Sequence, residues 1–174
     1  VYDGAPTVFT SFMATIVKAA GFIAFIKVFE TQRLALSFSW YIILPFVIVS
    51  TLLIGNITAV FQRSVKRMLA YSSIAQAGFM LFALYGRSIF NNEAILLYIV
   101  AYSLATIGVF AVLIKMKNYS IESFNGLAKQ NPALAFVTTV FLFSLAGIPP
   151  TVGFAAKLGV LEALVDAEHT FLAV

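Results

Sequence analysis

The sequence predicts an all-α, polytopic transmembrane helix bundle of about six helices, and three observations support this. Of 174 residues, 61% are hydrophobic and only 10% are charged, whereas soluble domains are about 45–50% apolar and about 25% charged. The apolar residues gather in runs of about 20, the length with which an α-helix crosses a bilayer. These runs are apolar on every face, unlike the alternating strands of membrane β-barrels.

Six apolar stretches are candidate transmembrane helices. They cover residues 7–29, 37–61, 65–85, 94–114, 132 to about 147, and 151 onward. The fifth stretch ends at Gly147-Ile148-Pro149-Pro150, where two adjacent prolines prevent a continuous helix. We therefore expect at least one broken helix in the bundle.

The links between these stretches are short, apart from residues 115–131. Short links favour antiparallel neighbours, which makes a bundle. The sequence opens at Val1 without an initiator methionine and ends inside an apolar stretch. We interpret residues 1–174 as a single transmembrane domain, an internal fragment of a longer chain.

The orientation of this domain is not assigned from the sequence. The Val1 end and every second link form one side, which carries basic residues at positions 63, 66, 67, 115, 117 and 129. The other side carries them at 27, 33 and 87. The positive-inside rule would place the first side in the cytoplasm. If residues 63, 66 and 67 face the bundle interior, however, each side keeps three basic residues and the rule gives no orientation.

The composition also excludes several kinds of site. There is no cysteine, so disulfides, thiolate metal sites and Fe–S ligation are excluded within these residues. The net charge of +4 is scattered between apolar runs without a basic stripe, so no nucleic-acid partner is expected. His169 lies beside Asp166 and Glu168, and a solvated loop is expected there rather than a metal site. No nucleotide, flavin or other cofactor motif is present.

Lys18 is the most informative residue. At about 1.5 Å of rise per residue it lies roughly 17 Å along the first helix, near the bilayer centre. An ammonium there costs at least about 2.5–3.5 kcal/mol, so it must face water, a carboxylate or backbone carbonyls. We predict a proton relay, and the alternative is a structural lysine paired with a buried acid. Lys27 is close enough to a helix end to reach the interface.

Lys157 follows Pro150 by seven residues. Broken helices at membrane depth are tolerated only where they are buried in protein or line a wet cavity. Lys157 is therefore predicted to belong to an ion path. The alternative is that Pro149-Pro150 forms an ordinary loop with a solvated lysine after it.

Lys66 lies in the basic run Arg63–Arg67, which an interfacial loop would explain equally well. At helical spacing Lys66, Ser73 and Gln76 fall near one face. Such a face can hold a hydrogen-bonded water chain, although small polar residues in membrane helices more often join helices together.

Three blocks of the sequence resemble the antiporter-like membrane subunits of respiratory complex I. The first is Val1-Tyr2-Asp3-Gly4-Ala5-Pro6-Thr7 with Lys18 downstream; the second is Gly55-Asn56 followed by residues 65–74; the third is residues 144–150 with Gly153-Phe154 and Lys157. Within this family the sequence looks most like subunit N, the relative of mitochondrial subunit 2. The opening block and the lysine at 157 carry that distinction.

The resemblance implies a chain of about 14 helices built from two inverted repeats, in the bacterial inner membrane. It implies a non-redox subunit of NADH-quinone oxidoreductase, in which Lys18, Lys66 and Lys157 form a proton relay with water. NADH oxidation and quinone reduction would belong to other subunits, so this chain would bind no cofactor. Its partners would be other membrane subunits of the complex and the lipid bilayer. The alternatives are a multisubunit cation/proton antiporter subunit and a structural membrane scaffold without a working channel.

Overall fold

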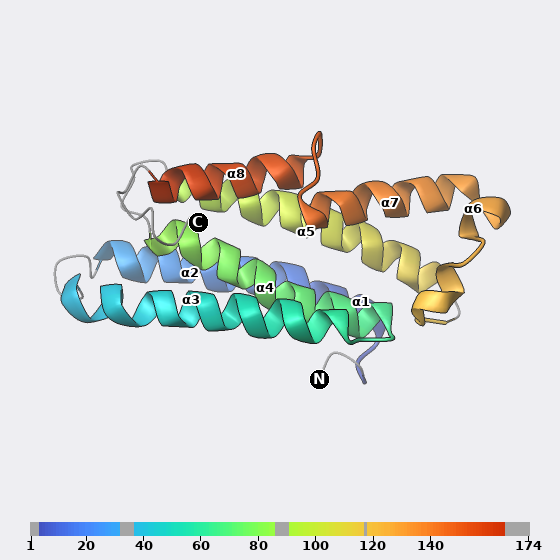
Figure 1. Ribbon diagram of the computed structural model, residues 1–174, viewed down its shortest axis with the longest axis horizontal. Helices are drawn as coiled ribbons and strands as arrows, with labels where there is room; N and C mark the ends of the chain where they lie inside the picture. Colours follow the sequence, from blue (N-terminus) through green and yellow to red (C-terminus); the bar gives the residue numbers. More distant parts are fainter. Residues whose placement is uncertain (1–3, 32–36, 86–90, 117, 166–174) are drawn as a thin grey trace.

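The computed structural model describes residues 4–31, 37–85, 91–116 and 118–165, and this part of the chain is built from helices (Figure 1). The first long helix consists of α1 (Thr7–Phe12), a π-helical segment η1 (Met13–Val17) and α2 (Lys18–Thr31). It is followed by α3 (Ser37–Val60), α4 (Val65–Tyr85), α5 (Asn91–Lys115), a 3₁₀ turn η2 (Ile121–Phe124), α6 (Leu127–Gln130), α7 (Pro132–Ala146) and α8 (Val152–Val165). The all-α prediction is confirmed, and the predicted stretches begin and end within a few residues of these helices.

Four helices are long and apolar enough to cross a membrane. Within the described ranges these spans are Thr7–Val28, Ile42–Val60, Val65–Tyr85 and Asn92–Lys115. Consecutive spans run antiparallel, as the short links predicted, and α3 lies alongside α4 over most of its length (Figure 1). The chain therefore folds as a polytopic bundle.

The fifth and sixth candidate helices are not two separate crossings. α7 has 15 residues and α8 has 14, each shorter than the roughly 20 that span a bilayer. Figure 1 shows them end to end, running in the same direction along α5, and both pack against α5. The expectation that a short link reverses the chain was wrong here, because Pro149-Pro150 interrupts one crossing instead of joining two.

Local sequence explains where α7 begins and ends. The Asn131 side chain accepts a hydrogen bond from the Leu134 N–H, and Pro132 occupies the first turn, where its missing N–H is not needed. Gly147 closes the helix in the left-handed conformation with φ of 80°, which favours glycine. The result is a helix whose last carbonyls point at the start of α8.

Two glycines allow helices to approach closely. A Cβ at Gly55 of α3 would lie 2.6 Å from the backbone N of Ala75 in α4. A Cβ at Gly108 of α5 would lie 2.2 Å from the Phe141 ring of α7. Small residues in this role are typical of membrane helix interfaces, where close van der Waals packing replaces the hydrophobic effect.

The π segment η1 shifts the buried stripe of the first helix by one residue. Thr7, Thr10 and Ala14 are buried at the spacing of a regular α-helix, which would continue at residues 21 and 25. Those two positions are exposed instead, and the inward-facing residues are Phe22 and Ile26. A π segment adds one residue to a helical turn, which accounts for the shift.

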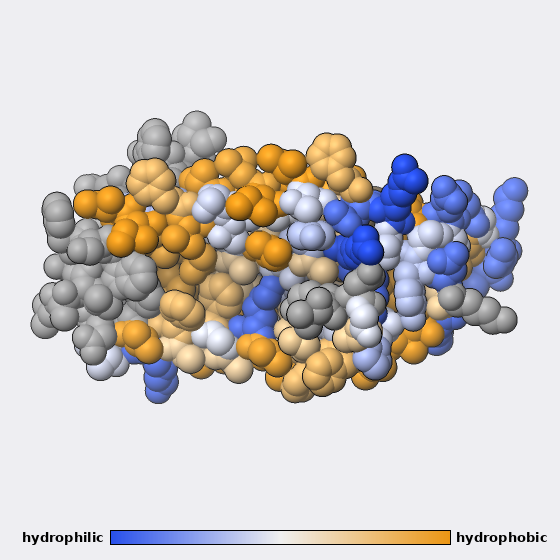
Figure 2. All heavy atoms as spheres, turned by 90° about the horizontal axis from the view of Figure 1, so that it is seen from below, coloured by the Kyte–Doolittle hydropathy of each residue, from blue (hydrophilic) through white to orange (hydrophobic). Residues whose placement is uncertain are grey.

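The outer surface matches a lipid environment along the bundle and water at one end. Large apolar side chains such as Phe46 and Val60 are 75% and 80% exposed on α3. Figure 2 shows apolar residues across the middle of one face and hydrophilic residues gathered at the end where α6 lies. The exposed basic residues of that end include Arg63, Arg67 and Lys129, whereas Lys66 is buried. Only one of the three basic residues at 63, 66 and 67 therefore turns inward.

Candidate functional site

Lys18 lies in the middle of the span Thr7–Val28 and points into the bundle. Its Nζ donates a hydrogen bond to the backbone oxygen of Ser73 on α4 and sits 5.5 Å from the centre of the Tyr102 ring on α5. Of the environments that the sequence allowed for this ammonium, the structure provides a backbone carbonyl, and it adds the face of the Tyr102 ring, which was not predicted. The placement deep in the bundle agrees with the prediction.

Lys157 lies in the first turns of α8 and reaches back over the interruption. Its Nζ donates to the backbone oxygens of Leu145 and Ala146, at 3.1 and 2.9 Å, and lies 4.9 Å from the Phe79 ring centre. These carbonyls end α7, where the helix dipole places partial negative charge. Lys157 is partly buried and bound to backbone oxygens, an environment that favours the ion-path prediction over the alternative of a solvated lysine after an ordinary loop.

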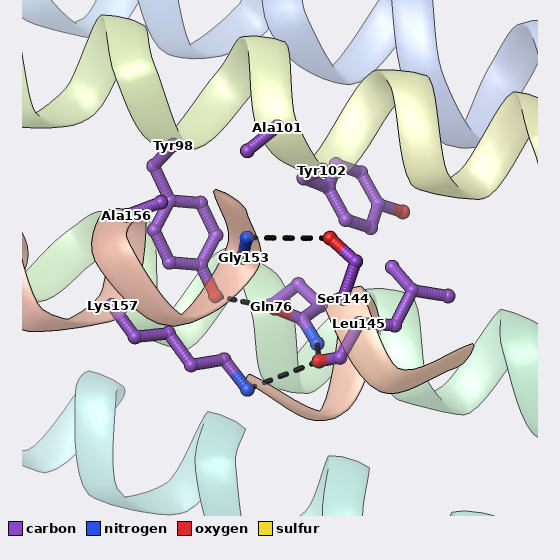
Figure 3. Close-up of a pocket in the computed structure, with 9 residues that line it drawn as sticks. All are labelled: Gln76, Tyr98, Ala101, Tyr102, Ser144, Leu145, Gly153, Ala156 and Lys157. Atoms are coloured by element: carbon purple, nitrogen blue, oxygen red, sulfur yellow. Dashed lines mark hydrogen bonds between the residues drawn. The ribbon is translucent and has the colours of Figure 1, made fainter. Parts of the chain in front are cut away.

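Gln76 links three helices between these two lysines (Figure 3). Its Nε2 donates to the Leu145 oxygen of α7 at 3.1 Å, and its Oε1 accepts a hydrogen bond from the Tyr98 hydroxyl of α5. Leu145 thus receives hydrogen bonds from both Gln76 and Lys157. Lys157, the Leu145 oxygen, Gln76 and Tyr98 therefore form one hydrogen-bonded series across α8, α7, α4 and α5. Ser73, the partner of Lys18, lies one helical turn from Gln76 on α4.

A small cavity lies in the middle of this series. Its lining residues are Gln76, Tyr98, Ala101, Tyr102, Ser144, Leu145, Gly153, Ala156 and Lys157 (Figure 3). The cavity has a volume of about 10 Å³, which is room for about one water molecule. Tyr102 joins the cavity to Lys18, and its hydroxyl donates to the Ala14 oxygen in η1 at 3.0 Å.

Lys66 occupies a different place, at the end of the bundle that carries most of the exposed basic residues. It lies in the first turn of α4, is 3% exposed, and donates to the Ala5 backbone oxygen. Its Nζ also faces the Tyr119 ring at 5.6 Å, and the Tyr119 hydroxyl accepts from Thr7 at 2.9 Å. The structure therefore places Lys157 in the hydrogen-bonded series and Lys18 on a partner one turn of α4 away, whereas Lys66 lies apart from both, at one end of the bundle.

The prediction that Lys66, Ser73 and Gln76 share one face is confirmed, since all three are buried on α4. Sequence reasoning missed Tyr98, Tyr102 and Ser144, which lie inside apolar runs. The signal available for the two tyrosines was their spacing of four residues, which places both hydroxyls on one face of α5.

The chemistry of the site is that of amines, hydroxyls and amides. No group of three or more His, Cys, Asp or Glu is placed to hold a metal ion within the described residues, and His169 lies outside them. Lysine amines and tyrosine hydroxyls can both give and take a proton, whereas a carboxamide or a backbone carbonyl only fixes orientation. The arrangement suits proton exchange between fixed groups through an intervening water.

The whole chain, residues 1–174, matches the family described as NADH:quinone oxidoreductase/Mrp antiporter, TM. The chain belongs to this family. It is similar to NADH-quinone oxidoreductase subunit N 1 of Herpetosiphon aurantiacus, at 42% identity over the full chain and 36% of that relative. It is equally similar to subunit N of Bdellovibrio bacteriovorus and subunit N 2 of Rhizobium meliloti, at 42% identity each.

Membership of the NADH:quinone oxidoreductase/Mrp antiporter family confirms the resemblance drawn from the three sequence blocks. The relatives are named as subunits of an oxidoreductase complex, and the apolar spans make this chain a multi-pass membrane protein. The chain spans little more than a third of the length of the relatives that it matches.

Proposed function

We propose that this chain is part of a membrane subunit of a bacterial NADH-quinone oxidoreductase and that it carries protons across the inner membrane. The redox reactions, NADH oxidation and quinone reduction, would occur in partner subunits. The names of the relatives support the assignment to this complex. Other membrane subunits of the complex would couple the redox reactions to proton movement in this chain.

One observation carries the proposal: two lysines of an apolar bundle bind backbone oxygens, one within a hydrogen-bonded polar series and the other one turn of α4 away from it. Lys18 binds the Ser73 carbonyl, and Lys157 shares the Leu145 carbonyl with Gln76. Amines placed at membrane depth are costly and are kept where they serve an ion path.

The proposed path uses Lys18, the cavity and Lys157. Lys66 would take part at the end of the bundle that carries Lys129. A proton released from Lys18 passes beside Tyr102 to a water in the cavity and then to the amine of Lys157. The hydroxyls of Tyr98 and Tyr102 can accept one proton while they donate another, so they can take part without a net change of charge. Gln76 holds the cavity wall in place and takes no proton.

Electrostatic repulsion gives the transfer a direction. Two ammonium groups in a medium of low dielectric constant repel each other with an energy of roughly 332/(εr) kcal/mol. That repulsion biases proton occupancy, so protonation of one lysine favours release from the other. A signal from the redox subunits would decide which lysine is charged first.

The test replaces Lys18 in the full-length subunit within the assembled complex. In inverted membrane vesicles driven by NADH, Lys18→Ala should sharply lower the number of charges moved across the membrane per quinone reduced, because the proposed path loses one of its amines. Lys27→Ala is the matched control, because Lys27 is an exposed lysine of the same helix, and it should leave the ratio unchanged.

The alternatives give different results in the same vesicles. Normal proton movement in Lys18→Ala, with normal quinone reduction, would reject the role of Lys18 and favour a structural scaffold. Exchange of Na⁺ for protons by the isolated full-length chain, without NADH, would favour a cation/proton antiporter.

A further inference from the structure

The carbonyl end of α7 has the features of a binding site for a small cation. The helix ends at Ala146, so its last carbonyls have no partners within the helix. Two of them, those of Leu145 and Ala146, converge on one point, 3.1 and 2.9 Å from the Nζ of Lys157. The Phe79 ring faces the same point at 4.9 Å, which adds a cation–π contact.

The backbone around this point leaves room for the methylene chain of the Lys157 side chain. Gly147 lies in the left-handed conformation, and a Cβ there would stand 2.8 Å from Cδ of Lys157 and 3.3 Å from its Nζ. Ser144 accepts a hydrogen bond from the Gly153 N–H at 3.2 Å, which fixes the start of α8 against the end of α7. The end of α7 and the start of α8 are therefore fixed in close contact, and the missing Cβ of Gly147 leaves room for the Lys157 side chain.

We propose that the end of α7 is a binding site for a primary ammonium group, and that in this protein Lys157 fills it as a tethered ligand. The two carbonyls accept N–H donors, and the ring receives the charge. An alkali ion needs a fuller shell of oxygens than two carbonyls and a ring supply. The two carbonyls and the ring therefore select an ammonium group over Na⁺ and K⁺. The site itself does not depend on the proposed proton transport.

The test removes the tether and offers a free amine. Full-length Lys157→Ala is purified in detergent, and its thermal unfolding is followed by far-ultraviolet circular dichroism in methylammonium chloride or tetramethylammonium chloride at equal ionic strength. A ligand at ten times its Kd multiplies the folding constant by about 11, and this raises the unfolding midpoint. We expect that rise with methylammonium only, because tetramethylammonium has no N–H donor.

Two further variants are matched controls. Lys27→Ala, at an exposed lysine, should gain nothing from methylammonium, since its site is untouched. Lys157→Gln refills the space with a neutral amide and should also gain nothing. If the alanine variant folds only when methylammonium is present throughout purification, the inference is supported; if it folds in neither salt, the inference is overturned.

Other outcomes overturn the inference or separate it from the proposed function. An equal rise with NaCl would show that the site does not select amines, and no rise with methylammonium would show that there is no site. In vesicles, charge movement is recorded with a membrane-potential dye, because free amines collapse pH gradients. Normal charge movement in Lys157→Ala, together with the methylammonium shift, would reject Lys157 as a proton carrier and keep the binding site.

Discussion

Removing either partner of the Tyr98–Gln76 hydrogen bond should destabilise the bundle, and removing both should cost less than the sum. The two residues are 2% and 6% exposed, so neither finds bulk water as a substitute. Interhelical hydrogen bonds within membranes are worth about 0.6 kcal/mol on average and up to about 1.7 kcal/mol. Tyr98→Phe keeps the ring, whose centroid lies 6.3 Å from the centroid of the stacked Phe79 ring. It removes only the hydroxyl that donates a hydrogen bond to Gln76.

The expected magnitudes follow from the bonds that each variant loses. Tyr98→Phe removes one bond and should cost about 1 kcal/mol. Gln76→Leu removes two and should cost about 1–2 kcal/mol, while the Leu145 carbonyl keeps Lys157 as a partner. In the double variant the shared bond is lost once, so its cost should fall short of the sum by about 0.6–1.7 kcal/mol.

The assay is reversible unfolding of the full-length chain in mixed micelles, with increasing mole fraction of dodecyl sulfate, for the four members of the cycle. A second cycle pairs Gln76→Leu with Thr15→Val as a control. Thr15 is 1% exposed and its hydroxyl bonds the Ser11 carbonyl of its own helix at 2.7 Å. That cycle should be additive within about 0.3–0.5 kcal/mol. Additivity in the Tyr98–Gln76 cycle would refute the connected polar series.

Two further predictions concern packing and orientation. Gly153→Ala should cost about 1–3 kcal/mol of stability, because its Cβ would lie 1.8 Å from the Ser144 backbone oxygen. Gly159→Ala in the same helix has nothing within 4 Å of the added Cβ and should be neutral or stabilising by up to about 1 kcal/mol. Equal unfolding midpoints for the two variants would contradict this packing. Exposed basic residues lie at the end of the bundle that carries Lys129, and the positive-inside rule places such an end in the cytoplasm. A membrane-impermeant maleimide should therefore label Lys129→Cys from the cytoplasmic side and Lys27→Cys from the opposite side. Labelling with the sides exchanged would reverse this orientation.

Helices and buried lysines could be predicted because each leaves a strong local signal. The stretch 65–85 is apolar for the length of a bilayer and starts after a short polar link, and α4 has those bounds. Lys18 could be placed deep in the bundle from the helical rise alone, since no end of its helix is within reach.

The partners of the lysines could not be predicted, because they come from residues far apart in the chain. Lys18 binds a backbone carbonyl at Ser73, and any residue type could have supplied that atom. Tyr98 looks like one more aromatic in an apolar run until α4 is packed against α5. The direction of α8 was also out of reach, since a proline pair ends a helix without stating where the chain goes next.

The π segment at Met13–Val17 leaves the first helix with one residue more than its contacts need. A chain shortened by one position there would form an ordinary α-helix, and Phe22 and Ile26 would still face α4 and α5. The shortened helix would present a different backbone oxygen to the Tyr102 hydroxyl, which now binds Ala14. The extra residue therefore determines which backbone oxygen of the first helix meets Tyr102, the residue whose ring Lys18 faces.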